Sequence, residues 1–175
     1  MATAYMPLTA LNLSPLDGSA GNEAPALDFV QSSGAAPAPR VARWAFDDTA
    51  NEHVSVAFRM PGNYASDPVL KIDWYAAATS GDVVWCAELS AITESDAATP
   101  ENKTGDAVNA VDDTVDGTTL ELNQCSITLT NADSVAAGDL VMLVLYRDPE
   151  DASGNTDTLV GDAYLLGASL EFTTT

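Results

Sequence analysis

The sequence predicts an all-β fold, namely an antiparallel two-sheet β-sandwich of the jelly-roll kind that follows an extended N-terminal arm. Three observations support this prediction. From Trp44 onward apolar and polar residues alternate with a period of two, turn signals separate these runs, and no long segment has the spacing of an amphipathic helix. Six or more such strands pack stably only as two facing layers. The 175 residues suit one globular domain.

Residues 1–43 differ from the rest because they are rich in Ala, Pro, Gly and Ser and have no sustained periodicity. Proline lacks a backbone donor and fixes φ, so we expect an extended arm over 1–43 and a β-sandwich domain over 44–175. A frayed tail is the alternative. The apolar residues of the arm can bind either its own domain or a neighbouring subunit, and they form the predicted partner-binding set: Leu8, Leu11, Leu13, Leu16, Leu27 and Phe29.

Four strands have the clearest sequence patterns. Residues 54–60 alternate and end at Pro61-Gly62-Asn63, and residues 70–76 and 83–89 flank the turn Ser80-Gly81-Asp82, which predicts a hairpin. Residues 140–147 are apolar on both faces, as in a central strand covered on both sides. The predicted core between the sheets consists of Phe58, Trp74, Trp85, Met142 and Val144.

The remaining segments carry weaker patterns. Residues 93–117 read as an Asp-rich connection with a short helix at 107–111, and further strands are predicted at 118–122, 126–130 and 163–172. We expect removal of the arm to leave the domain formed by these strands folded.

The net charge of −20, from 26 acidic and six basic residues, excludes nucleic acid and anionic membrane surfaces as partners. An acidic surface suits a saline habitat or a densely arrayed protein. No basic residue precedes Arg40, so no secretory signal is expected and synthesis in a reducing cytoplasm is predicted. In that reducing compartment Cys86 and Cys125 would be buried free thiols, with a disulfide as the alternative.

Motifs for nucleophilic, phosphate-binding, dinucleotide-binding and zinc-protease sites are all absent. The only histidine, His53, lies in a predicted strand, where a structural role is favoured over a catalytic one. Carboxylate pairs for glycoside cleavage stay open because their separation is spatial. The sequence therefore predicts a protein that is not an enzyme and has no cofactor.

Two acidic loops raise the question of calcium, which requires oxygen ligands. Neither loop has the spacing of an EF-hand, so calcium at Asp148, Asp151 and Asp157 is only an alternative to solvated loops. The two loops contain, respectively, Asp148, Glu150, Asp151, Asn155 and Asp157, and Asp112, Asp113 and Asp116.

An ordered set of short motifs over residues 44–164 resembles the β-sandwich, jelly-roll-like structural proteins in virions of tailed bacterial and archaeal viruses. Each motif alone is ordinary strand and turn sequence, and their order carries the resemblance. The motifs are Trp44-Ala45-Phe46-Asp47, Glu52 before a strand, Met60-Pro61-Gly62-Asn63-Tyr64, Ile72-Asp73-Trp74-Tyr75, Ser80-Gly81-Asp82-Val83-Val84-Trp85, Ala137-Gly138-Asp139-Leu140-Val141, Tyr146-Arg147-Asp148 and Gly161-Asp162-Ala163-Tyr164.

This resemblance implies a capsid decoration protein that binds the outside of an icosahedral head and stabilises it. Its expected partners are the major capsid protein and further copies of itself in a homotrimer, and its expected location is the virion exterior.

Two alternatives stay open, a head or tail fibre domain that binds host glycans and a non-viral carbohydrate-binding β-sandwich. A glycan binder needs exposed aromatic rings beside carboxylates or amides. Tyr64, after a Pro-Gly turn, is expected to be exposed. The candidate rings are Trp44, Trp74, Trp85, Tyr5, Tyr64, Tyr75, Tyr146 and Tyr164.

Overall fold

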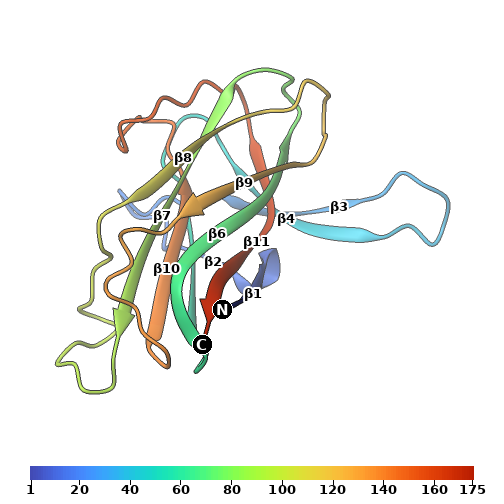
Figure 1. Cartoon of the computed structure of the whole chain (residues 1–175). Helices are drawn as coiled ribbons and strands as arrows, with labels where there is room; N and C mark the ends of the chain where they lie inside the picture. The colour runs from blue at the N-terminus through green and yellow to red at the C-terminus, as the bar shows by residue number, and fades with distance from the viewer.

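The computed structural model describes residues 1–175 as two sheets that pack face to face, and all pairings between their strands are antiparallel (Figure 1). The predicted all-β jelly-roll sandwich is confirmed. The first sheet has the order β3-β4-β11-β6-β9, with β1 also paired to β11, and the second sheet has the order β2-β5-β10-β7-β8. The strands of the first sheet are β1 (Ala2–Thr9), β3 (Ala26–Gln31), β4 (Arg40–Phe46), β6 (Tyr64–Ala76), β9 (Asn123–Thr128) and β11 (Ala163–Thr174). Those of the second are β2 (Ser14–Pro15), β5 (His53–Arg59), β7 (Asp82–Ile92), β8 (Asn109–Thr114) and β10 (Leu140–Arg147).

Helical structure is confined to one 3-10 turn, η1 (Ala10–Asn12). The structure contains no helix with the length and apolar character that a membrane span requires.

The core between the sheets is centred on two tryptophans. Trp74 and Trp85 are fully buried, as predicted. Their rings pack edge-on, with centroids 6.3 Å apart and an interplanar angle of 66°. Phe46 packs edge-on against Trp85 at 5.2 Å. Such edge-to-face contacts add to the free energy gained from burial alone.

The predicted hairpin between 70–76 and 83–89 is wrong. β6 belongs to the first sheet and β7 to the second, so the turn at Ser80-Gly81-Asp82 carries the chain from one layer to the other. The physical reason is that both strands direct a large apolar face inward, and Trp74 and Trp85 meet across the core instead of side by side in one sheet. Gly81 has a φ of +109°, and a Cβ there would lie 2.8 Å from the carbonyl oxygen of Thr158, so glycine is required at this crossing.

The predicted core is also wrong for Met142 and Val144. Both are half-buried on the outer face of β10, whereas Val141, Leu143 and Leu145 point into the core. Phe58 is partly buried and packs against the edge of the core. A strand that is apolar on both faces need not be covered on both faces by a second sheet.

Two weaker predictions in the Asp-rich connection differ from the structure. The segment expected to be a helix at 107–111 enters β8, which pairs with β7, and no strand forms over 118–122. The β-branched and polar residues of β8 complete an edge of the second sheet, where pairing with β7 outweighs a weak helical preference.

Residues 1–43 supply β1, η1, β2, β3 and the start of β4, so the boundary expected between residues 43 and 44 falls inside β4. β1 pairs with β11 over its whole length, from Ala2 opposite Thr174 to Thr9 opposite Gly167. Leu8 and Leu13 are buried in the core, and the Trp44 indole donates to the carbonyl oxygen of Ala10 at 2.8 Å. This part of the segment straps its own domain.

The next part of the segment behaves differently. β3 and β4 form a hairpin that projects from the sandwich (Figure 1), and every residue of β3 is exposed. Arg43 fixes the base of this hairpin, because its guanidinium pairs with Asp28 at 2.8 Å and donates to the Tyr75 hydroxyl of β6 at 2.7 Å.

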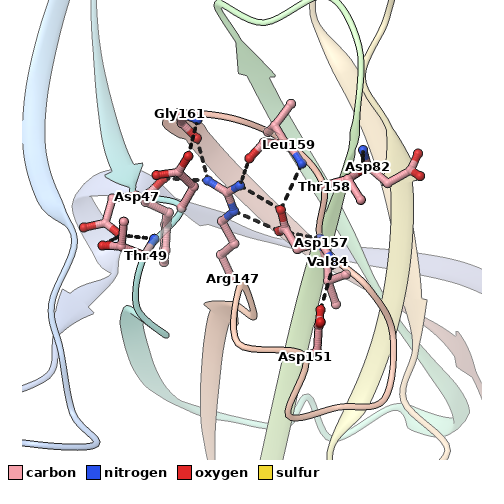
Figure 2. A network of polar contacts seen from close by, with 12 residues as sticks. Asp47, Thr49, Asp82, Val84, Arg147, Asp151, Asp157, Thr158, Leu159 and Gly161 are labelled. Atoms are coloured by element: carbon pink, nitrogen blue, oxygen red, sulfur yellow. Dashed lines mark hydrogen bonds and ion pairs between the residues drawn. The ribbon is translucent and has the colours of Figure 1, made fainter.

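A buried polar network holds the loop between β10 and β11 against the sandwich (Figure 2). Arg147 at the end of β10 is fully buried and pairs with Asp157 at 2.8 Å. Its remaining donors reach the carbonyl oxygens of Phe46, Leu159 and Gly161. Asp157 in turn accepts from the Val84 amide at 3.0 Å. Arg147 of β10 thus connects the second sheet with β4 of the first, and its partner Asp157 extends the connection to β7.

Candidate functional site

The three calcium candidates do not converge on one point. Asp148 is buried and accepts from the amides of Ala152 and Ser153, Asp157 faces Arg147, and Asp151 accepts from the Asp157 amide. No group of three or more His, Cys, Asp or Glu residues in the structure has the arrangement of a metal site. These carboxylates stabilise the turns of their own loop.

Neither cysteine is part of a disulfide or a reactive centre. Cys86 and Cys125 are buried free thiols on β7 and β9, in different sheets. Burial raises the pKa of each thiol to about 12, so both are protonated and unreactive. His53 stacks on Tyr146 with centroids 4.6 Å apart, and its Nδ1 atom has no hydrogen-bond partner.

The tryptophans provide no binding platform, because Trp44, Trp74 and Trp85 are all buried. Tyr64, which the sequence predicted to be exposed, is 7% exposed and packs against Phe172 of β11. The Pro-Gly turn before it folds back onto the sheet, and its hydrogen bond from the Tyr64 amide to the Pro61 carbonyl directs the ring inward.

Three other tyrosines lie on the outer face of the first sheet. Tyr75 and Tyr164 form a tilted pair with centroids 5.1 Å apart, and Arg43 lies over Tyr164 at 3.8 Å. These ring faces are occupied by one another and by Arg43. Tyr5 lies on β1, opposite Glu171 of β11, and is 64% exposed.

A groove crosses the outer face of the second sheet, and we call it the β5–β10–β7 groove. Its volume is about 290 Å³, at the lower end of the range of pockets that hold small ligands. Strands form the floor, and the 93–107 loop and Leu16 form its sides. The residues that line it are Leu16, Ser55, Val56, Ala57, Glu88, Ser90, Pro100, Lys103, Gly105, Met142 and Val144.

The floor of the groove combines an apolar strip with polar side chains. Met142 and Val144 of β10 are half-buried, and Glu88 and Ser90 of β7 and Ser55 of β5 lie beside them. In the register of the sheet, Val144 stands directly between Glu88 and Ser55, and Met142 stands between Ser90 and Ala57. Because side chains on adjacent strands of one face are neighbours, each apolar residue has a hydroxyl or carboxyl group next to it.

Glu88 is the acidic residue of this groove, and its carboxylate is nearly free. Its one hydrogen bond comes from the Tyr146 hydroxyl at 3.4 Å, which is long for an O–H donor. Burial raises the pKa of Tyr146, and the neighbouring Cys86 and Glu88 side chains act in the same direction, so the hydroxyl stays a donor. The carboxylate retains acceptor positions for a ligand.

Several contacts fix the 93–107 loop over the groove, and one of them is the hydrogen bond from the Asp106 amide to the Leu89 carbonyl at 3.0 Å. Lys103 pairs with Asp133 at 2.8 Å, and this contact raises the pKa of Lys103. Gly105 packs directly on Glu88, since a Cβ at this position would lie 2.9 Å from Glu88 Oε2. The loop therefore sets both the width of the groove and the position of the Glu88 side chain.

Sequence reasoning placed one of these residues in its candidate set, Leu16, and missed the others. The one signal in the sequence is the second apolar face of residues 140–147, which fits a strand covered on both sides as well as the floor of a groove. Glu88 and the 93–107 loop gave no local signal, since their meeting depends on how the loop folds back across β7. The other predicted arm residues lie elsewhere: Leu8 and Leu13 in the core, Leu11 exposed within η1, and Leu27 and Phe29 on the hairpin.

No protein-family model matches this sequence, and no curated protein sequence is similar to it. Solved structures with a similar fold include the family 11 carbohydrate-binding module from Clostridium thermocellum, with a TM-score of 0.49, 10% identity, and coverage of 97% of this chain and 96% of that one. They also include the CBM22-1 xylan-binding domain from Paenibacillus barcinonensis, with a TM-score of 0.49, 10% identity, and coverage of 99% and 97%. A family 35 module from Clostridium thermocellum has a TM-score of 0.47, 8% identity, and coverage of 95% and 97%.

The resemblance to virion proteins of tailed viruses is therefore wrong, and so is the capsid-decoration function inferred from it. The three similar structures named above are carbohydrate-binding modules. The motifs that carried the resemblance mark strand ends and turns, such as Pro61-Gly62-Asn63 after β5 and Gly138-Asp139 before β10. Any antiparallel sandwich needs such turns, so their order is no evidence for a virion protein. The expected capsid partner and virion location, which were inferred from the same resemblance, stay untested predictions.

Proposed function

We propose that this protein is a non-catalytic carbohydrate-binding β-sandwich that binds a neutral polysaccharide in the β5–β10–β7 groove. The observation that carries the proposal is the apolar strip of Met142 and Val144 flanked by the under-used carboxylate of Glu88 and the hydroxyls of Ser55 and Ser90. A sugar ring has an apolar C–H face and a rim of hydroxyl groups. The groove has none of the aromatic rings expected of a glycan binder, so Met142 and Val144 supply the apolar contact for the C–H face and the polar side chains face the hydroxyl groups.

The charge of the protein favours a neutral ligand. With a net charge of −20 the protein repels acidic polysaccharides, and Lys103, the basic residue that borders the groove, is already paired with Asp133. The acceptor at Glu88 is suited to sugar hydroxyl donors. Hydrogen bonds to a charged acceptor of this kind are stronger than those between two neutral groups.

The groove also supports a binding role in preference to a hydrolytic one. Glycoside hydrolysis generally needs two carboxyl groups across the scissile bond. Glu88 is the single acidic residue that lines the groove. One carboxylate can hold a hydroxyl group but cannot supply both halves of the reaction.

The test is affinity electrophoresis and titration calorimetry with mixed-linked β-glucan, xylan and mannan, and with polygalacturonate as the anionic comparison. Because a hydrogen bond to a charged group contributes about 1.5–3 kcal/mol, Glu88→Ala is expected to weaken binding by roughly tenfold or more. Gly105→Ala, which displaces the Glu88 side chain, should weaken binding as well.

The matched control is Glu94→Ala, which removes a carboxylate from the exposed part of the same loop and should leave binding unchanged. Equal binding by the wild type and Glu88→Ala would exclude this groove as the site. If none of the neutral polysaccharides bound, the proposal of carbohydrate binding would be overturned.

A further inference from the structure

The β3–β4 hairpin has a free strand edge that faces solvent. β3 pairs with β4 on one side, from Ala26 opposite Ala45 to Gln31 opposite Arg40, and has no strand on the other. All of its residues are exposed, and Leu27, Phe29 and Val30 are between 37% and 43% exposed. Exposed apolar edge strands readily pair with another chain unless a charge, a proline or a covering element protects them.

The hydrogen-bond pattern shows which backbone groups are free. The Ser32 amide donates to the Pro39 carbonyl at 2.9 Å, one step beyond the last strand pair. In an antiparallel ladder hydrogen-bonded pairs alternate, so the amides and carbonyls of residues 26, 28 and 30 point toward β4. Those of Leu27, Phe29 and Gln31 point outward. The Phe29 amide meets only the side chain of its neighbour Asp28, at 2.6 Å.

We propose that β3 pairs antiparallel with β3 of a second copy of this chain, so that the two first sheets become one continuous sheet. The inference goes beyond the proposed carbohydrate binding and does not depend on it. With Phe29 opposite Phe29 of the second copy, Leu27 stands opposite Gln31, and all outward backbone groups are matched.

This register, with Phe29 opposite Phe29, is favoured over the register in which Gln31 lies opposite Pro25. About six hydrogen bonds form when each of the three outward residues on one strand meets an outward residue on the other. A shift by one pair of residues would place Gln31 opposite Pro25, which has no amide proton, and would set Asp28 against Asp28. When the two copies pair, the Phe29 amide no longer donates to the Asp28 carboxylate and donates instead to the Phe29 carbonyl of the second copy.

The charge distribution selects a second copy as the partner. The hairpin over residues 26–46 contains Arg40, Arg43 and Asp28 as its charged residues, a net charge of +1, while the rest of the chain carries −21. The hairpin projects from the sandwich (Figure 1), so pairing at β3 keeps the two acidic bodies apart. The rest of the chain carries the whole excess of negative charge, so on average repulsion opposes a contact made elsewhere on the molecule. The residual repulsion is screened by salt.

The test is sedimentation velocity over a concentration series at low and high salt, with full-length wild type, Phe29→Pro and Phe29→Ala. Phe29→Pro removes the central outward amide without removing a hydrogen bond to β4, and edge strands tolerate proline at such positions. We expect a wild-type dimer that tightens as salt rises, a weaker dimer for Phe29→Ala, and a monomer for Phe29→Pro.

Folding is monitored by the thermal transition of each variant, which should match that of the wild type. Gln31→Pro provides a second backbone variant at the end of the same edge, where the apolar side chains are untouched, and it should also weaken the dimer. A wild type that is monomeric at every concentration and salt would overturn the proposal, as would a dimer that survives both proline substitutions.

Discussion

Arg147 and Asp157 form a buried ion pair in which all five donors of the guanidinium are used. Two donate to the Asp157 carboxylate at 2.9 and 2.8 Å, and the others to the carbonyl oxygens of Phe46, Leu159 and Gly161 (Figure 2). The Arg147 side chain is fully buried and that of Asp157 is 2% exposed. The pair costs desolvation energy, and these extra hydrogen bonds offset that cost.

Arg147→Met should destabilise the protein severely, because it leaves Asp157 buried without its cation and three carbonyls without a donor. Removal of one partner of a buried pair costs about 3–5 kcal/mol. Urea unfolding monitored by tryptophan fluorescence measures the change. The matched comparison is Arg59→Met, since Arg59 is exposed and donates to a single carbonyl, that of Gly138. Similar losses for both variants would contradict the structural role of the buried network.

Trp85→Ala should lower the free energy of unfolding by roughly 3–5 kcal/mol, as is typical when a large aromatic core residue is truncated. Trp85 is fully buried and touches Phe46 and Trp74 from the facing sheet. The measurement is chemical denaturation, and Leu122→Ala at an exposed position is the control. A loss below about 1 kcal/mol would place Trp85 outside the core.

The layer arrangement of the strands was only partly predictable from the sequence. The two-residue period identified β5, β6, β7 and β11, because alternation reports which face of a strand is buried, and a continuous apolar run identified β10. It does not report which sheet a strand joins. The turn at Ser80-Gly81-Asp82 fits a hairpin as well as a crossing between layers, and the choice depends on the contact of Trp74 with Trp85.

The candidate site was less predictable for a related reason. Met142 and Val144 read as core residues, since an apolar side chain has the same identity in a covered core and in an open groove. Glu88 is one of 26 acidic residues and has no distinguishing neighbour in sequence. Its role depends on the packing of Gly105 on its side chain, 17 residues later in the chain, which no local pattern encodes.

Deletion of residues 1–13 should abolish cooperative unfolding or lower the melting temperature strongly. The deletion removes β1, which pairs along β11, together with the buried side chains of Leu8 and Leu13. It also leaves the Trp44 indole without the Ala10 carbonyl. This outcome is the opposite of the expectation from composition alone, under which the whole segment could be removed without loss of the fold.

The control for this deletion replaces the hairpin tip, residues 33–38, with a short Asn-Gly turn that closes on the hydrogen-bonded pair Ser32–Pro39. That tip is outside both sheets, so the melting temperature of the control should stay close to that of the wild type. Circular dichroism melts compare the three proteins. An unchanged melt for the 1–13 deletion would show that β1 contributes little to the sandwich.

Glu52 should make the stability of the protein depend on pH between about 5 and 8. Burial raises the pKa of Glu52 from 4.5 to about 7, the Asp47 and Asp162 carboxylates act in the same direction, and the Asp47 amide and Arg147 oppose the shift. The folded protein thus binds a proton more tightly than the unfolded chain. The resulting stabilisation is complete below the unfolded pKa and is lost as pH rises through the folded pKa.

Glu52→Gln isolates this contribution, because the amide oxygen of Gln can still accept the hydrogen bond from the Asp47 amide, which is 2.8 Å in the wild type. Gln does not titrate, so the variant should lack this part of the pH dependence. Glu52 is only partly buried, so after solvent screening we expect the variant to gain about 1–2 kcal/mol over the wild type between pH 5 and pH 8. Urea unfolding at pH 5, 6, 7 and 8 gives the two curves, and Glu94→Gln on the exposed loop provides a control whose curve should parallel that of the wild type. Parallel curves for the wild type and Glu52→Gln would mean that Glu52 is already ionised in the folded protein at pH 5.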